Sequence, residues 1–160
     1  YWNIDYPAMK KKGESLGVEM RRHPIRDFDV PHMRERLAGA VSGLAALRRA
    51  EHKTYVHCTA GMGRAPLTVL GYLALIEHVD PEDAIQMILA GRPGACPAWE
   101  AFHGARDDLV LLYRDEIEQR AYVIYEQTGI EDPDVNWRQA EVEVLTDVLI
   151  NIGRQDQFVA

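Results

Sequence analysis

The 160-residue chain has few cysteines, fewer cations than anions and no long apolar run. Two cysteines cannot form a disulfide framework, so we expect a reducing compartment. No run approaches the roughly 18 apolar residues of a membrane span, which argues against a chain that crosses a bilayer. Lys and Arg number 18 against 25 Asp and Glu, a net charge of −7. This balance argues against a general nucleic-acid binder, whose phosphate contacts need clustered cations.

Histidine pairs at metal-ligand spacing are also missing. The six histidines are scattered singly through the sequence, whereas metal sites place ligands at short fixed intervals. We therefore predict no metal site.

Apolar periodicity and capping residues predict an α/β protein. Short strands are expected at residues 17–23 and 53–57, which are β-branched or aromatic and bounded by turn signals. Helices are expected at residues 5–17, 32–50, 65–77, 80–91 and from 98 towards 127 with one break, followed by a last helix after a linker at 129–135. The final elements are helices alone, so the order indicates an α/β domain with a helical C-terminal extension.

Residues 56–66 (VHCTAGMGRAP) carry the chemistry of the chain. They join an expected strand to an expected helix, and Cys58 is followed six positions later by Arg64. A short glycine-bearing loop can turn its N–H groups inward, and the helix N-terminus adds positive potential, so the segment suits a phosphate dianion. The guanidinium can grip two phosphate oxygens, and the same field should lower the pKa of the Cys58 thiol and make it a nucleophile.

The predicted cradle for phosphate is the backbone of Thr59, Ala60, Gly61, Met62, Gly63 and Arg64. The bland interpretation of the same residues is a buried cysteine at a strand end, followed by an ordinary glycine turn. The other thiol, Cys96, is interpreted either as a buried cysteine or as a redox partner of Cys58.

The segment HCTAGMGRAP resembles the signature loop of the cysteine-dependent dual-specificity phosphatases. Its ending is similar to that of the plant and algal glucan phosphatases, the starch-excess and like-starch-excess proteins related to laforin. Most dual-specificity phosphatases carry Ser or Thr directly after the arginine, whereas Ala65 stands here, a departure shared with the starch-type branch. The resemblance covers residues 1–115 and is most specific at 26–31 and 54–66.

This resemblance implies a cysteine-phosphatase fold, with a central sheet flanked by helices. The family domain begins several tens of residues before the position of Tyr1, so we expect its first strands to be absent here. Residues 1–115 then form the C-terminal part of the phosphatase domain, and residues 116–160 form the helical extension. Within the extension, Trp137 is expected to pack between two helices.

By the same resemblance, the first Asp of the Asp-Phe-Asp run supplies the general acid, which is Asp27 in this chain. Asp29 is the reserve candidate, with helix capping as its alternative role. The family also lines a substrate channel with aromatic rings, which corresponds here to Phe28 and to the pair Tyr1 and Trp2. Flat apolar rings can cover sugar faces, although Tyr1 and Trp2 could instead belong to a core.

The sequence therefore predicts a phosphatase that hydrolyses phosphate monoesters on a phosphorylated α-glucan such as starch, without a cofactor and as a monomer. The resemblance places it in a plastid, or in the cytoplasm of an organism with cytosolic starch. Two alternatives stay open. One is the same chemistry on a phosphoprotein or phosphoinositide, and the other is a glucan-binding scaffold without turnover.

Overall fold

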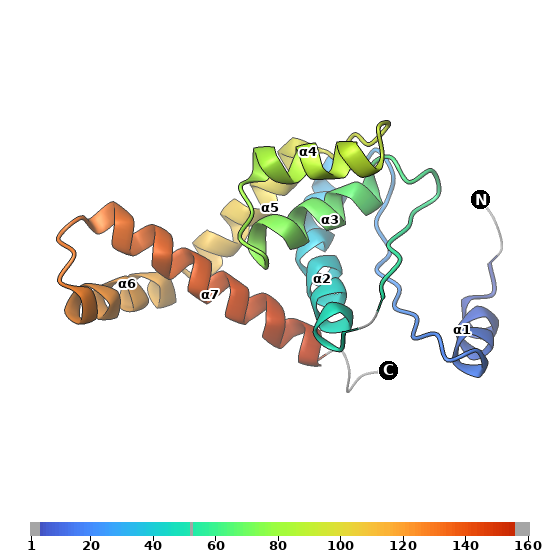
Figure 1. The fold of residues 1–160 in the computed structure, drawn as a ribbon, viewed down its shortest axis with the longest axis horizontal. Coiled ribbons are helices and arrows are strands. Elements are labelled where there is room, and N and C mark those ends of the chain that lie inside the picture. Colours follow the sequence, from blue (N-terminus) through green and yellow to red (C-terminus); the bar gives the residue numbers. More distant parts are fainter. Residues whose placement is uncertain (1–3, 52, 156–160) are drawn as a thin grey trace.

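The computed structural model describes residues 4–51 and 53–155 of the chain. Its helices are α1 (Tyr6–Ser15), α2 (Val30–Arg49), α3 (Arg64–Leu75), α4 (Pro81–Gly91), α5 (Trp99–Leu112), α6 (Arg114–Thr128) and α7 (Pro133–Gln155). Figure 1 shows an elongated arrangement, with α1 at one end, the hairpin of α6 and α7 at the other, and α2 to α5 between them.

The helix starts follow from capping residues that are visible in the sequence. The Asp5 carboxylate accepts the backbone N–H of Ala8 at 3.0 Å, and that of Asp80 accepts the N–H of Glu82 at 3.0 Å. Proline stands in the first turn of α1 and of α4, where its missing N–H costs nothing. These predicted helices are confirmed, as is the break between α5 and α6, which falls at Tyr113.

One apolar core joins α2, α3, α4, α5 and α7. Helix α2 lies at its centre and packs against α3, α5 and α7. The fully buried side chains of this core include Leu37, Val41, Leu67, Leu70, Phe102 and Leu149. A smaller cluster of Ile117, Ile124 and Ala140 closes the α6–α7 hairpin, and Trp137 packs against it as expected. Leu145 and Leu149 of α7 belong to the main core, so α7 contributes to both clusters.

The predicted central sheet is wrong for the part of the chain that the structure describes. Neither residues 17–23 nor residues 53–57 form a strand, and every regular element in the described ranges is a helix. Both segments are irregular and run beside the helices (Figure 1). In the sequence, residues 17–23 connect α1 to α2, and residues 53–57 belong to the connection from α2 to α3.

The reason lies in what a strand requires. A helix satisfies its backbone hydrogen bonds internally, whereas strands need several neighbours and a covered apolar face before they are stable. Here a cavity of about 1250 Å³ opens between the two segments and α2. The side chains that a sheet would cover stay accessible, with Val18 52% and Tyr55 85% exposed.

Candidate active site

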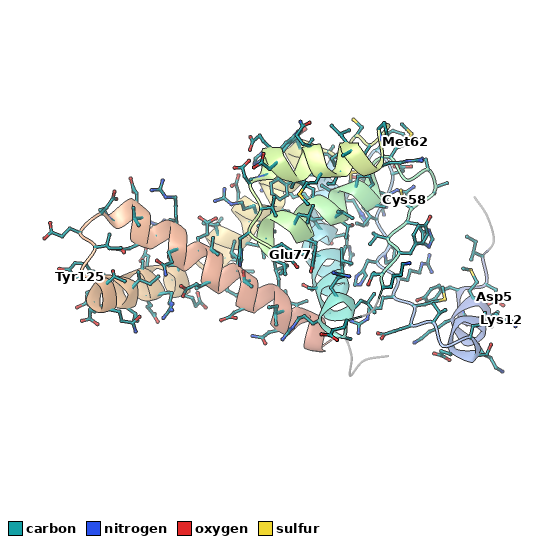
Figure 2. All side chains as sticks on the ribbon, in the orientation of Figure 1. Asp5, Lys12, Cys58, Met62, Glu77 and Tyr125 are labelled. Carbon is teal, nitrogen blue, oxygen red and sulfur yellow. The ribbon has the colours of Figure 1, made fainter. Side chains whose placement is uncertain are left out.

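The predicted cradle is the loop of residues 58–63, which enters α3 at Arg64. Cys58 and Met62 lie at the end of the helical region nearer to α1, and Tyr125 lies at the opposite end (Figure 2). Gly63 is the N-cap of α3 but makes no side-chain cap, so the first N–H groups of this helix are available to other acceptors. Gly61 has a φ of +69°, a conformation that favours glycine and lets the loop turn tightly.

The Cys58 thiol lies inside the ring of loop N–H groups. Its Sγ accepts the backbone N–H of Gly61 at 3.3 Å. Partial burial raises the pKa of Cys58, but the N–H groups of Ala65, Gly61 and Ala60 and the charge of Arg64 together lower it below its usual value. The thiolate, the nucleophilic form, is therefore favoured by the surroundings that the sequence predicts.

The Arg64 guanidinium joins the cradle to the segment before α2. Its Nη1 donates to the carbonyl of Ile25 at 3.2 Å, and its Nη2 donates to Asp27 Oδ2 at 2.9 Å and to Thr59 Oγ1 at 3.0 Å. The side chain is 19% exposed, and its buried Nε has no hydrogen-bond partner among the described residues. A donor of this kind, next to the thiol, suits an anionic oxygen.

The two candidate acids have different surroundings. Asp29 is the N-cap of α2, where its carboxylate accepts the N–H of His32 at 3.0 Å, and this bond lowers the pKa of Asp29. Asp27 faces Arg64 instead, and its side chain is 43% exposed. The structure therefore brings Asp27, and not Asp29, to the guanidinium beside the thiol. Its role as general acid stays a prediction.

A second loop, residues 92–98 between α4 and α5, supports the cradle from outside. Arg92 Nη2 donates to the carbonyl of Ala60 at 3.1 Å, and the backbone N–H of Cys96 donates to the carbonyl of Met62 at 2.7 Å. Sequence reasoning missed these contacts. The only signal was an arginine at the start of a glycine- and proline-bearing loop, RPGACP, which does not by itself indicate a partner.

Comparison with known families fits this geometry. Residues 4–103 match the model of the dual specificity phosphatase catalytic domain, a span that includes Asp27, the cradle and the supporting loop. The chain belongs to this family.

Two curated relatives of this dual specificity phosphatase are plant proteins. The amyloplastic phosphoglucan phosphatase DSP4 of Castanea sativa is 29% identical over 143 residues, which cover 87% of this chain and 38% of the relative. The chloroplastic phosphoglucan phosphatase LSF1 of Arabidopsis thaliana is 32% identical over 114 residues, which cover 71% of this chain and 19% of the relative. The chain thus spans well under half the length of either relative.

Of the aromatic residues predicted for the substrate channel, Phe28 lies in the described part of the chain. Phe28 directly follows Asp27, is 95% exposed and has a φ of +57°. Residues other than glycine rarely adopt this left-handed backbone conformation, which costs about 1–2 kcal/mol. Such outliers gather at functional sites. Tyr1 and Trp2 lie outside the described residues, so their predicted contacts stay predictions.

Both cysteines of the phosphatase are free thiols. Cys58 is partly buried, whereas Cys96 is exposed. The expectation of a buried Cys96 is therefore wrong, because the buried side chains of this loop are the neighbouring Ala95 and Pro97. Cys96 itself is bonded to the cradle through its backbone N–H.

Within residues 4–51 and 53–155, no cluster of His, Cys, Asp or Glu side chains could hold a metal ion. Over the same ranges, none of the helices combines the length and apolar character that a bilayer crossing needs.

Proposed function

We propose that this chain hydrolyses phosphate monoesters on a phosphorylated α-glucan through a phosphocysteine intermediate. The observation that carries the proposal is the convergence of Cys58, Arg64 and Asp27. Asp27 and Arg64 are 37 positions apart in the sequence, yet their side chains are hydrogen-bonded at 2.9 Å. A nucleophile, an anion-binding guanidinium and a carboxyl group are the parts that phosphoryl transfer through cysteine requires.

In the first step, the Cys58 thiolate attacks phosphorus and forms an S–P bond while the P–O bond to the sugar breaks. Asp27, in its protonated form, gives its proton to the departing sugar oxygen. The N–H groups of residues 59–64 and the Arg64 side chain stabilise the charge on the three equatorial phosphate oxygens. The Gly61 N–H already donates to Cys58 Sγ at 3.3 Å, and the N–H of Ala60 and the charge of Arg64 also act on the thiol.

In the second step, a water molecule attacks phosphorus and the S–P bond breaks, which returns the thiolate. The Asp27 carboxylate takes the water proton and is restored to its acid form. Arg64 Nη2 donates to both Asp27 and Thr59. An incoming phosphate competes with Asp27 for this nitrogen and thereby releases the carboxyl group for proton transfer.

Two observations support a glucan as the substrate. The curated relatives are named phosphoglucan phosphatases. In addition, Phe28 presents an almost fully exposed ring directly beside Asp27, and an aromatic face can cover a sugar ring while the hydroxyl groups stay hydrated. The amyloplastic and chloroplastic names of the relatives support a plastid as the location.

Phosphate release from phosphorylated amylopectin and from p-nitrophenyl phosphate tests the proposal. We expect both activities to vanish in Cys58→Ser, since a serine hydroxyl is not ionised at neutral pH. Cys96→Ser is the matched control and should retain them, because the Cys96 contact with Met62 is made by the backbone. Turnover of the aryl phosphate alone would contradict the glucan assignment, and turnover of neither substrate would favour a binding scaffold.

A further inference from the structure

Arg92 covers the outer side of the cradle at its tightest point. It follows α4 directly, as the C-cap residue of this helix. Its Nη2 donates to the Ala60 carbonyl at 3.1 Å, and the guanidinium also lies over Gly61, where a Cβ would be 3.7 Å from Nη2. Arg92 itself is exposed, so burial does not hold the side chain in this position. The contact with the loop does.

This contact determines the direction of a donor on the inner side. A peptide group is planar and trans, so its C=O and N–H point in opposite directions. The carbonyl of Ala60 and the N–H of Gly61 belong to one peptide group. The carbonyl faces Arg92, and the N–H faces Cys58 Sγ at 3.3 Å. A rotation of this peptide would break both bonds together.

A second carbonyl of the cradle, that of Met62, is also held by a hydrogen bond from the loop of residues 92–98, but its donor is a backbone N–H. The Met62 carbonyl accepts the Cys96 backbone N–H at 2.7 Å, so the peptide that it shares with Gly63 is also held from outside. A backbone donor survives most substitutions. The Arg92 contact depends on one side chain, which makes it the part of this support that mutation can remove.

We propose that Arg92 is a positioning residue, which holds the Ala60–Gly61 peptide so that its N–H is aimed at the Cys58 thiolate and at the phosphate oxygens that replace it as acceptors. The proposal rests on the proposed phosphocysteine chemistry for its kinetic consequence. Its structural consequence, the state of the thiol, can be measured without any substrate.

The first test is the pH dependence of Cys58 alkylation by iodoacetamide, measured in a Cys96→Ser background. Charged or titratable groups around the thiol include Arg64, which is paired with Asp27, and the preceding residue His57. Arg92 bonds the Ala60 carbonyl, and Arg26, His23 and His32 line the same cavity as Cys58. We expect Arg92→Met to move the alkylation midpoint to higher pH, because the thiolate loses an aligned N–H donor. Arg92→Lys keeps the charge and a donor group, so its alkylation midpoint should lie between those of the parent protein and of Arg92→Met.

Salt separates positioning from simple charge. Arg92 is exposed, so the effect of its charge on the thiol should be screened at 1 M salt, where the Debye length is about 3 Å. A change in peptide orientation persists at that ionic strength. If the midpoint of Arg92→Met returns to that of the parent protein at high salt, Arg92 acts only as a charge and the proposal is wrong.

The second test is turnover of p-nitrophenyl phosphate and phosphorylated amylopectin. We expect Arg92→Met to lower kcat on both substrates by on the order of 10- to 100-fold, somewhat below the effect of removing an oxyanion-hole donor outright. A loss confined to KM for amylopectin would instead make Arg92 a glucan contact and overturn the proposal. Arg114→Met, which removes an exposed arginine paired with Glu118 in α6, is the matched control and should leave kcat unchanged.

The two proposals can fail separately. If the parent protein leaves amylopectin untouched, the glucan assignment fails while the alkylation test of Arg92 still stands. If the alkylation midpoint and kcat are the same in Arg92→Met and in the parent protein, the positioning role fails while the phosphatase assignment stands. Should Arg92→Met not fold, Arg92→Lys carries the same comparison, with the smaller shift expected for a single retained donor.

Discussion

The helical region of this protein and the two irregular segments, residues 17–23 and 53–57, are stabilised in different ways. Leu67 and Phe102 in the helices are fully buried, whereas Val18 and Tyr55 in the irregular segments are 52% and 85% exposed. The candidate active site lies where helical and irregular chain meet, because Arg64 begins α3 and Asp27 comes from the irregular chain that leads into α2. A rigid helix start thus holds the anion-binding group, while the candidate acid is carried by a less buried segment.

The largest expected effect on stability separates two phenylalanines. Phe102→Ala removes a fully buried ring from the core of the helices and should lower the free energy of unfolding by about 3–5 kcal/mol. Phe28→Ala removes the same group at a position that is 95% exposed and should change it by at most about 0.5 kcal/mol. Urea denaturation of the two variants measures both values. Similar losses would contradict the distinction between the two regions.

Local sequence was sufficient for the helices. Asp5 and Asp80 cap the helices that they were expected to cap, since a cap depends on residues two or three positions away. The helix that begins at Arg64 was predictable from the apolar residues that follow it. The phosphate-binding role of the loop before it stays a prediction.

The predicted strands and the role of Arg92 depend on distant residues. Strand-forming residues such as Val18 and Tyr55 indicate a pleated surface only when neighbouring strands and a covered face are present, and the described residues supply neither. Arg92 and Ala60 are 32 positions apart, and nothing in the spacing of RPGACP specifies its partner. In both cases local propensity does not identify the interacting residue, which is a neighbouring strand for the predicted strands and the Ala60 carbonyl for Arg92.

The next effect concerns α7, which sequence analysis assigned to an extension beginning at residue 116. Leu149 is fully buried in the main core, whereas Val142 of the same helix is 43% exposed. Leu149→Ala should therefore cost about 2–5 kcal/mol, and Val142→Ala should stay within about 0.5 kcal/mol. A single cooperative transition in both variants is expected. An early transition confined to part of the molecule in Leu149→Ala would show that residues 116–160 fold independently.

A smaller effect distinguishes the two aspartates of the Asp-Phe-Asp run. The bond from the His32 N–H lowers the pKa of Asp29 below the usual value of an aspartate. A lowered pKa means that the native state favours the ionised form, so the stabilisation is present above the unfolded pKa and is lost as pH falls through the native one. Asp29→Ala should lower the melting temperature at pH 7 more than at pH values below the native pKa.

Asp27→Ala is the matched change, because it removes an equal carboxylate from a partly exposed ion pair instead of a helix cap. Its melting temperature at pH 7 should stay closer to that of the parent protein, while its phosphate release falls. The reverse pattern, with stability lost at Asp27 and turnover lost at Asp29, would exchange the roles of the two residues.

The smallest expected effect tests the absence of a sheet directly. Tyr55 is 85% exposed in the irregular segment of residues 53–57, which precedes the cradle. Tyr55→Ser should change the free energy of unfolding by at most about 0.5 kcal/mol, the range of exposed substitutions. A central strand of a covered sheet would behave differently, because burying an aromatic side chain stabilises a protein by about 1.5–3 kcal/mol. A loss of that size in Tyr55→Ser would mean that residues 53–57 are covered in solution, and that the strand predicted from the sequence does form.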